Sequence, residues 1–246
     1  MRTIKGSIFG SFCVLLSILT LQSCTKTFDD KLVSNQNYDN SATLQVFVAT
    51  VGAARNYVYV DSKPVNGAAL AFGSLFPASG LGVSVPSGFR GLMLRDTLST
   101  TTQPQLSFGM TFQAGTAYTL FAYDTLSSVK IKAVQTSLVT PSDTSCRVRF
   151  ANFAYNGVAI TPAIDIVSTG KNEVVATNVP YTGVTEFVAH PSLLANEGFQ
   201  VREAGTSNIL ATISLISLAP KRSYTIVYRG SHRNPTGRFV SLINNF

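Results

Sequence analysis

Few side chains in this sequence of 246 residues could carry out catalysis. Of the two histidines, His190 precedes a proline and His232 lies in a Ser-His-Arg-Asn-Pro run, so both are predicted to be polar residues of surface loops. The one adjacent acidic pair, Asp29 and Asp30, lies in a polar segment that could not hold the fixed geometry of acid–base catalysis. We therefore predict no catalytic residues and no enzymatic activity. An enzyme would need a cleft that holds one histidine within hydrogen-bond reach of a carboxylate.

The sequence also lacks the motifs that hold cofactors and metals. It contains no Gly-x-Ser-x-Gly nucleophile elbow, no phosphate-binding glycine loop, no His-Glu-x-x-His zinc helix and no calcium loop. Asp61, Asp96 and Asp124 each follow a strand-like run, which is typical of Asx turns. We predict no cofactor and no metal site, and the ligand-binding residues stay unknown at this stage.

The first 23 residues have the features of a secretory signal peptide. Arg2 and Lys5 give a positively charged start, and residues 8–19 form an apolar core. That core, of about 12 residues, is too short to span a bilayer, which needs about 20. The alternative is a buried N-terminal helix of the folded protein.

A short motif ends this segment. Leu21-Gln22-Ser23-Cys24 resembles the lipobox of bacterial lipoproteins, with an aliphatic residue, a small residue and then a cysteine. The resemblance implies cleavage between Ser23 and Cys24. It also implies a diacylglyceryl group on the Cys24 sulfur and a further acyl group, such as palmitate, on the new amino terminus. These lipids would anchor the protein to a membrane. The alternative is an ordinary secretory signal, with Cys24 a plain thiol.

The residues after Cys24 bear on location. Thr25 stands where an aspartate would retain an enteric lipoprotein at the inner membrane, so the lipobox resemblance favours the outer membrane. Whether the protein faces the periplasm or the cell surface stays open. Residues 24–42 are polar and lack periodicity, so we interpret them as a flexible tether.

Processing changes the cysteine and charge balance. Cys13 would leave with the signal peptide, so Cys146 would have no disulfide partner in the chain, and we predict a buried thiol rather than a reactive or intermolecular one. The net charge would fall from +7 to +5, and the excess lies in the last 43 residues: Lys221, Arg222, Arg229, Arg233 and Arg238. This segment could meet lipid phosphates or acidic polysaccharide, or could be a solvated strand edge. A nucleic-acid partner is not expected, because aromatic residues do not alternate with these charges.

Alternating β-rich runs dominate the rest of the sequence. Runs of this kind, bounded by Gly, Pro, Asn or Ser, occupy residues 44–48, 57–60, 118–123, 129–134, 148–150, 163–167 and 224–228. About seven short strands per hundred residues are typical of an immunoglobulin-like sandwich. We predict an all-β protein of two tandem immunoglobulin-like antiparallel β-sandwich domains, residues 43–140 and 141–246.

An internal repeat supports two domains. Three motifs recur in the same order about 102 to 110 residues apart: Val46–Ala49 with Val148–Ala151, Gly88–Arg90 with Gly198–Gln200, and Phe112–Thr119 with Leu218–Thr225.

These motifs are similar to those of domain-of-unknown-function family 4397. Residues 57–61, 63–65 and 70–74 resemble its opening hairpin, and residues 112–120 its apolar, Ala-Gly, Tyr-Thr strand. Residues 147–152, 162–166 and 224–227 fit the same scheme in the second half, although Pro220 and Lys221 follow Ala219 where a glycine is usual. The resemblance implies an extracytoplasmic β-sandwich and no chemistry.

The sequence thus indicates a cell-envelope lipoprotein that serves as a non-enzymatic interaction or scaffold module. The alternative is a glycan- or polysaccharide-binding component of an outer-membrane uptake or adhesion system. Because the sequence has no Trp, sugar stacking would fall to tyrosines, whose other roles are cross-strand pairing or a tyrosine corner: Tyr57, Tyr59, Tyr123, Tyr155, Tyr181 and Tyr228. The expected partners are the membrane, through the anchor at Cys24, and an envelope protein or a glycan.

Overall fold

A computed structural model describes residues 40–78, 82–137, 139–157 and 159–245. The predicted signal peptide, with Ser23 and Cys24, and nearly all of the predicted tether lie outside these residues. Within the described ranges, no helix is both long enough and apolar enough to cross a membrane.

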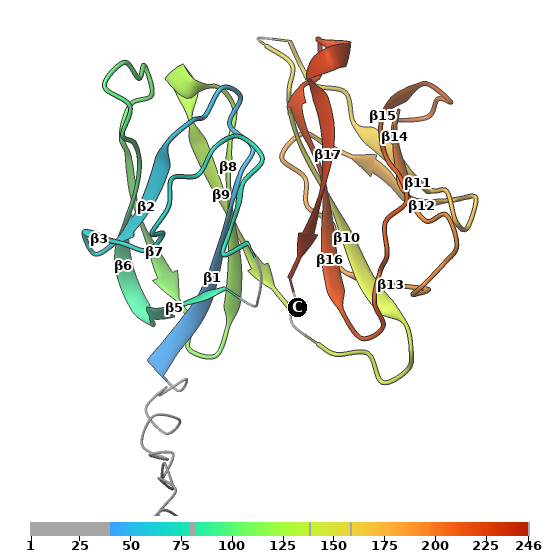
Figure 1. Cartoon of the computed structure of the whole chain (residues 1–246), viewed down its shortest axis with the longest axis horizontal. Coiled ribbons are helices and arrows are strands. Elements are labelled where there is room, and N and C mark those ends of the chain that lie inside the picture. Colours follow the sequence, from blue (N-terminus) through green and yellow to red (C-terminus); the bar gives the residue numbers. More distant parts are fainter. Residues whose placement is uncertain (1–39, 79–81, 138, 158, 246) are drawn as a thin grey trace, which may run out of the picture. The chain divides into compact units, whose positions relative to one another are not determined.

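The strands of the first half form two sheets (Figure 1). Sheet 1 has the order β4-β1-β8-β9, with β5 also beside β1, and sheet 2 has the order β3-β2-β6-β7. The 3-10 helix η4 (Leu126–Ser128) lies between β8 and β9. The strands are β1 (Ser41–Val48), β2 (Asn56–Val60), β3 (Lys63–Pro64), β4 (Leu75–Phe76), β5 (Val83–Pro86), β6 (Gly88–Asp96), β7 (Leu106–Phe112), β8 (Ala117–Tyr123) and β9 (Lys130–Thr136).

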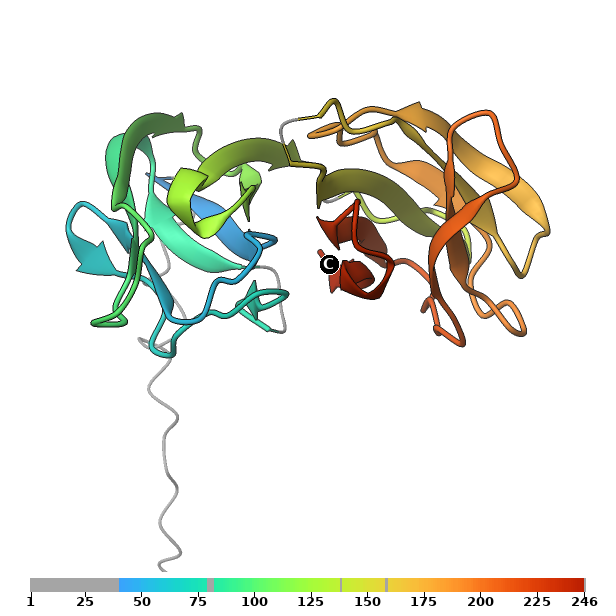
Figure 2. The same cartoon turned by 90° about the horizontal axis from the view of Figure 1, so that it is seen from above.

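The second half repeats this plan, and Figure 2 shows the same strands from above. Sheet 3 has the order β13-β10-β16-β17 and sheet 4 the order β12-β11-β14-β15. The 3-10 helix η5 (Pro235–Gly237) precedes the last strand. The strands are β10 (Cys146–Tyr155), β11 (Ile164–Ser168), β12 (Glu173–Val179), β13 (Val188–His190), β14 (Phe199–Glu203), β15 (Ile209–Ile213), β16 (Ser223–Ser231) and β17 (Arg238–Asn244).

The all-β sandwich prediction is confirmed, but the pairing is not purely antiparallel. In each half the first strand runs parallel to a strand near the end of that half, β1 beside β8 and β10 beside β16. The other strand pairs are antiparallel. Each predicted β-rich run overlaps a strand of the structure. The division into two domains stays a prediction, because contacts group residues 38–246 into one compact unit.

The structure confirms one motif match of the repeat. The hydroxyl of Tyr118 accepts a hydrogen bond from the amide of Gln113 at 3.1 Å, and that of Tyr224 accepts one from the amide of Ala219 at 2.9 Å. Both tyrosines bond an amide five residues before them, so each half contains the same tyrosine corner.

The other two matches are corrected. The amide of Thr43 bonds the carbonyl of Thr116, and the amide of Arg147 bonds that of Arg222, so β1 and β10 are related by 104 residues rather than 102. Because side chains alternate along a strand, a shift of two residues leaves the alternation pattern unchanged. Phe89 and Phe199 were also matched, but Phe89 is 72% exposed and Phe199 fully buried. Side chains at odd spacings along a strand lie on opposite faces, so an alignment of the two halves that is wrong by an odd number of residues pairs an outward side chain with a buried one. Phe89 and Phe199 are therefore not equivalent positions.

Each half has its own apolar core. Leu44, Val46 and Val48 of β1 pack with Leu92 and Leu94 of β6 between sheets 1 and 2. Between sheets 3 and 4, a second cluster gathers Val148, Phe150, Ile164, Phe199, Val201 and Ile226. Cys146 is fully buried in that cluster as a free thiol, as predicted. Burial of apolar area of this kind contributes about 25 cal/mol per Å².

A third apolar cluster joins sheet 1 to sheet 3. Phe47 and Phe121 from the first half pack against Phe153 and Val227 from the second. The rings of Phe121 and Phe153 are stacked with centroids 4.7 Å apart. Strands β1, β8, β10 and β16 are therefore buried on both faces, which explains their nearly continuous burial.

Beside this cluster lies a buried polar network around Arg149. Its guanidinium, 2% exposed, donates to Thr225 Oγ1 at 2.8 Å and to Thr136 Oγ1 at 3.0 Å. Thr225 in turn donates to Asn245, whose amide bonds Gln45 of β1. Burial lowers the pKa of Arg149 to about 10, so the side chain stays charged at neutral pH. The network bonds side chains of both halves across the third cluster.

Substitution of Thr225 by Val is expected to destabilise the protein by about 2 kcal/mol, since hydrogen bonds to charged groups are worth about 1.5–3 kcal/mol. Valine keeps the shape of threonine but removes the acceptor for Arg149 and the donor to Asn245. Equilibrium urea unfolding measures the change. The control is Thr212→Val at an exposed position of β15, for which little change is expected. Equal effects of the two substitutions would show that the Arg149 network does not stabilise the fold.

Candidate functional site

The predicted lipidation and cleavage residues, Cys24 and Ser23, lie outside the described residues. Both remain predictions from the sequence.

The two histidines are not surface residues, and this prediction was wrong. His190 ends β13 opposite Cys146 and is 2% exposed, and His232 is 8% exposed. His232 packs edge-on against the Tyr228 ring, and its Nδ1 lies 3.2 Å from the Tyr228 hydroxyl. A residue before proline favours extended backbone, so the Pro191 that suggested a loop is equally compatible with the end of a strand.

Four polar side chains from separate segments of the second half form a buried quartet: Cys146, Ser168, His190 and Glu197. His190 Nε2 lies 2.8 Å from Glu197 Oε2, and Ser168 Oγ donates to both Glu197 oxygens at 3.0 and 3.1 Å. The Glu197 carboxylate also accepts the Gly198 amide at 2.8 Å. Cys146 Sγ donates to the His190 carbonyl at 3.3 Å. Sequence reasoning missed this quartet because its members are up to about fifty residues apart.

The electrostatics of the buried quartet favour a structural role. Burial raises the pKa of Glu197, but the hydrogen bonds from His190, the Gly198 amide and Ser168 outweigh burial and lower it. Glu197 is therefore ionised at neutral pH. Burial raises the pKa of Cys146 to about 11, so its thiol keeps the proton and is a poor nucleophile. A histidine lies within reach of a carboxylate, as an enzyme would need, but Cys146, Ser168, His190 and Glu197 are each at most 2% exposed.

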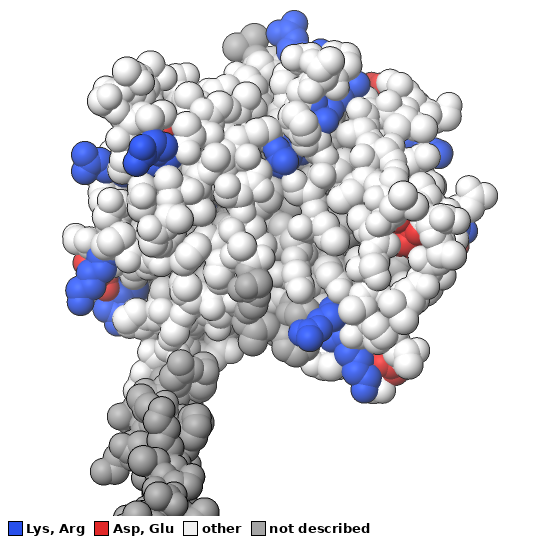
Figure 3. Space-filling view, in the orientation of Figure 1, with Lys and Arg blue, Asp and Glu red and all other residues white. Residues whose placement is uncertain are grey.

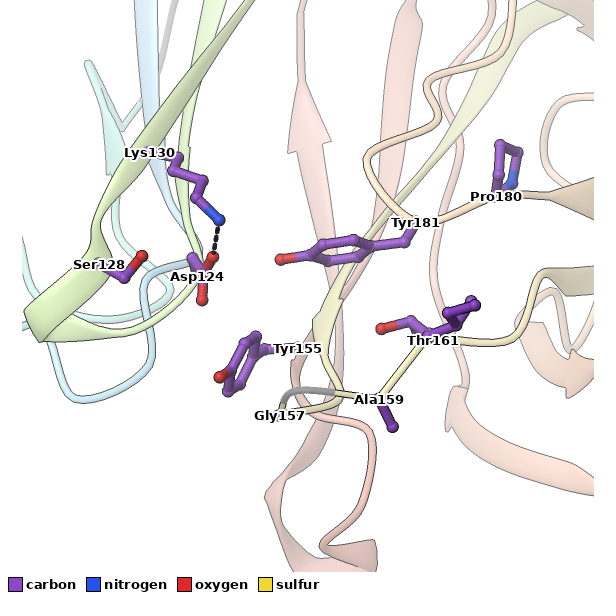
Figure 4. Close-up of a pocket in the computed structure, with 10 residues that line it drawn as sticks. Asp124, Ser128, Lys130, Tyr155, Gly157, Ala159, Thr161, Pro180 and Tyr181 are labelled. Carbon is purple, nitrogen blue, oxygen red and sulfur yellow. Dashed lines mark hydrogen bonds and ion pairs between the residues drawn. The ribbon is translucent and has the colours of Figure 1, made fainter.

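A cleft of about 540 Å³ is lined by both polar and aromatic side chains (Figure 4). We call it the cleft throughout. Its first side comes from the β8–β9 connection, with Asp124, Ser128 and Lys130, and its second side from residues of the second half: Tyr155, Gly157, Ala159, Ile160, Thr161, Pro180 and Tyr181. Figure 4 shows the Tyr181 side chain extending from the second side towards Asp124 and Lys130.

Asp124 and Lys130 form an ion pair in the cleft. Lys130 Nζ donates to Asp124 Oδ2 at 2.6 Å, with the lysine side chain 53% exposed and the aspartate side chain 5% exposed. The hydrogen bond raises the pKa of Lys130, so this side chain remains an ammonium. Asp124 Oδ1 and the Tyr181 hydroxyl are buried and have no hydrogen-bond partner among the described residues. Burial raises the pKa of Tyr181, so its phenol stays neutral and can donate its proton.

The three aspartates predicted to lie in turns behave differently. Asp96 Oδ1 accepts the amide of Leu98 at 2.8 Å, which is an Asx turn as predicted. Asp61 and Asp124 both have positive φ, 48° and 79°, and their carboxylates bond residues farther along the chain. Asp61 is bonded through both oxygens, to the Gly91 amide at 3.1 Å and to Arg90 Nη1 at 3.2 Å. Among these three, only Asp124 has a buried carboxylate oxygen without a partner among the described residues.

The basic residues near the C-terminus do not form one patch. Arg229 is half-buried, with its guanidinium 4.3 Å from the Phe72 ring centroid and 5.0 Å from that of Phe239. Arg238 donates to the carbonyl of His232 at 2.8 Å. On the face drawn in Figure 3, Lys and Arg side chains stand in small separate groups. The described residues also contain no cluster of three or more His, Cys, Asp or Glu suited to a metal ion.

Glu197→Gln is expected to destabilise the protein by about 2 kcal/mol at pH 7, because the buried carboxylate loses the charge that strengthens its hydrogen bonds from Ser168 and the Gly198 amide. The lowered pKa of Glu197 stabilises the fold above the pKa of the unfolded chain, and this contribution is lost as the pH falls through the folded pKa. The penalty of the substitution should therefore shrink between pH 7 and pH 3. Urea unfolding at both pH values measures it, with exposed Glu173→Gln as the control. A penalty independent of pH would contradict an ionised Glu197.

No family model matches the sequence, and no curated protein matches it. Among solved structures, the carbohydrate-binding module CBMbc of family CBM26 from Eubacterium rectale Amy13K, in complex with maltoheptaose, is 13% identical, with 82% of this chain and 96% of that chain covered and a TM-score of 0.25. The Bacillus anthracis TIE protein is 9% identical, with 77% of this chain but 34% of that chain covered and a TM-score of 0.22. This chain thus spans about a third of the TIE protein. With scores this low, neither likeness bears on the function of this chain.

Proposed function

We propose that this protein is a non-enzymatic interaction module of the bacterial cell envelope. The observation that carries the proposal is the packing of sheet 1 on sheet 3, through Phe47, Phe121 and Phe153 and the Arg149 network. This packing joins two sandwiches into one compact unit and holds their surfaces in a fixed relation. In this proposal the buried quartet has a structural role, which the cover of protein over its side chains supports.

The anchor is part of the same proposal. Cleavage before Cys24 and acylation of that residue would hold the protein at the outer membrane, on its periplasmic face or at the cell surface. The first described strand begins at Ser41. A flexible tether between Cys24 and this strand has a reach of roughly 23 Å, enough to keep the folded part clear of the lipid headgroups.

Glycan binding is a second candidate function, as a component of an uptake or adhesion system. The cleft favours it, because two tyrosines, an ion pair and hydroxyl side chains gather there. Sugars are bound through stacking on aromatic rings together with hydrogen bonds to their hydroxyl groups, and small-molecule sites in proteins occupy about 300–1,000 Å³. A binding module of either kind needs no catalytic group.

Metabolic labelling with a fatty-acid analogue tests the anchor. Label is expected on the wild-type chain and not on Cys24→Ala, because only the Cys24 sulfur can take the diacylglyceryl group. Cys146→Ala serves as the matched control and should be labelled like the wild type, since that thiol is buried. Protease treatment of intact cells then separates surface from periplasmic exposure. Equal labelling of wild type and Cys24→Ala would refute the lipid anchor.

A further inference from the structure

We infer that the cleft binds a neutral sugar, and that Asp124 and Lys130 together hold two adjacent hydroxyl groups of that sugar. The inference rests on the proposed binding function, and it names the ligand class and the residues that contact it. Four observations carry it: unpartnered buried atoms, the charge of the lining, the apolar surface beside it and the backbone conformation of Asp124.

The first observation is that two polar atoms in the cleft lack partners. Asp124 Oδ1 and the Tyr181 hydroxyl are buried without a hydrogen bond to any described residue. Native structures bond nearly all of their buried polar atoms, and an unpaired one is costly. Of the six buried side-chain atoms without a partner among the described residues, these two lie on opposite sides of one cleft, so one ligand bound there would supply both missing bonds. In Figure 4 the second oxygen of Asp124 points away from Lys130.

The second observation is the balance of charge and hydrogen-bonding groups. Asp124 and Lys130 are the two charged residues that line the cleft, and they neutralise each other. An acidic ligand would be repelled by the carboxylate of Asp124 at close range and would gain little from a lysine already paired. A pair of adjacent hydroxyl groups fits better, because one hydroxyl can donate to Asp124 while its neighbour accepts from Lys130. The hydroxyls of Ser128, Thr161 and Tyr181 add donors and acceptors.

The third observation is the apolar surface next to these polar groups. The rings of Tyr155 and Tyr181, with Pro180 and the exposed Ile160, line the second side of the cleft. Each sugar ring has a face of C–H groups that packs on aromatic and aliphatic side chains, while its hydroxyls point sideways. The cleft thus offers apolar surface for the C–H face of a sugar ring and hydrogen-bonding groups for its hydroxyls. Lys130 is half-exposed, so its side chain can shift to admit a hydroxyl to the covered Asp124 oxygen.

The fourth observation comes from the internal repeat. The tyrosine corners show that Tyr118 of the first half is equivalent to Tyr224 of the second half. By the same spacing along the chain, Asp124 is equivalent to Gly230. Both residues have positive φ, 79° and 99°. Glycine adopts this conformation without steric cost, whereas aspartate adopts it less readily. The first half therefore carries an aspartate where the backbone favours glycine, and the side chain of that aspartate is the one with the unpartnered oxygen.

Calorimetric titration of the full chain tests the inference, with the protein in a detergent that has no sugar headgroup. The probes are neutral oligosaccharides of glucose, mannose and galactose, and oligogalacturonate as the acidic comparison. At least one neutral probe is expected to bind, and oligogalacturonate at least about tenfold more weakly. Asp124→Asn and Lys130→Met should each weaken binding of the neutral probe at least about tenfold, and Tyr181→Phe about threefold.

Asp61→Asn is the matched control, because Asp61 also has positive φ and also pairs with a basic residue, but both of its oxygens are bonded. It should leave affinity unchanged. Thermal melts show whether each variant is folded, and Lys130→Met, which changes a half-exposed side chain, serves if Asp124→Asn fails to fold.

Several outcomes would overturn the inference. These are no binding of any neutral probe, tighter binding of oligogalacturonate, or wild-type affinity in folded Asp124→Asn or in Lys130→Met. Loss of affinity in Asp61→Asn alone would place the site on sheet 2 instead. Failure of the sugar site can be told apart from failure of the proposed function. Suppose that no sugar binds, but that Cys24 is acylated and a photo-cross-linker at Tyr155 captures an envelope protein in cells. The protein is then an interaction module without a sugar site.

Discussion

Burial of two sheets on both of their faces is the constraint on which this structure depends. Strands β1 and β8 of sheet 1 and β10 and β16 of sheet 3 each contribute one face to a sandwich core and the other to the contact between the halves. Ordinary apolar packing fills the middle of that contact, and Arg149 with its threonine partners occupies the part beside it. The cleft begins where these strands leave the contact, since Asp124 directly follows β8 and Tyr155 ends β10.

Three buried acidic or basic side chains differ in how many hydrogen-bond partners they have. Arg149 is held by neutral hydroxyls and one ring face, and Glu197 by a histidine, a serine and an amide. Both have several partners, as buried charges require. Asp124 has Lys130 on one oxygen and no described partner on the other. Of these three, only Asp124 has a buried polar atom without a described partner, and the proposed sugar site rests on that atom.

The sequence predicted seven of the seventeen described strands as β-rich runs, because alternation of polar and apolar residues records which face of a strand is buried. It failed where that alternation is absent or ambiguous. Phe47, Phe121 and Phe153 stand at positions that a single sandwich would leave outward, so their burial depends on a second sheet that no local pattern reveals. His190 was placed in a loop because of Pro191, although its burial depends on Glu197 and Ser168. The two sides of the cleft are 25 to 57 positions apart in the sequence, and only the fold brings them together.

Comparison of the two halves separates what the fold needs from what is specific to one site. Both halves keep the tyrosine corner, because it fixes the loop before a central strand. Positions that face the opposite half differ between the two halves. Tyr123 is equivalent to Arg229 when the halves are aligned on their tyrosine corners, and Gln45 is equivalent to Arg149 when they are aligned on their first strands. The contacts between the halves reflect this difference: Arg229 of the second half lies over the Phe72 ring of the first, and Arg149 donates to Thr136. The cleft depends on the same difference between the halves, since its aspartate and lysine come from the first half and both of its tyrosines from the second.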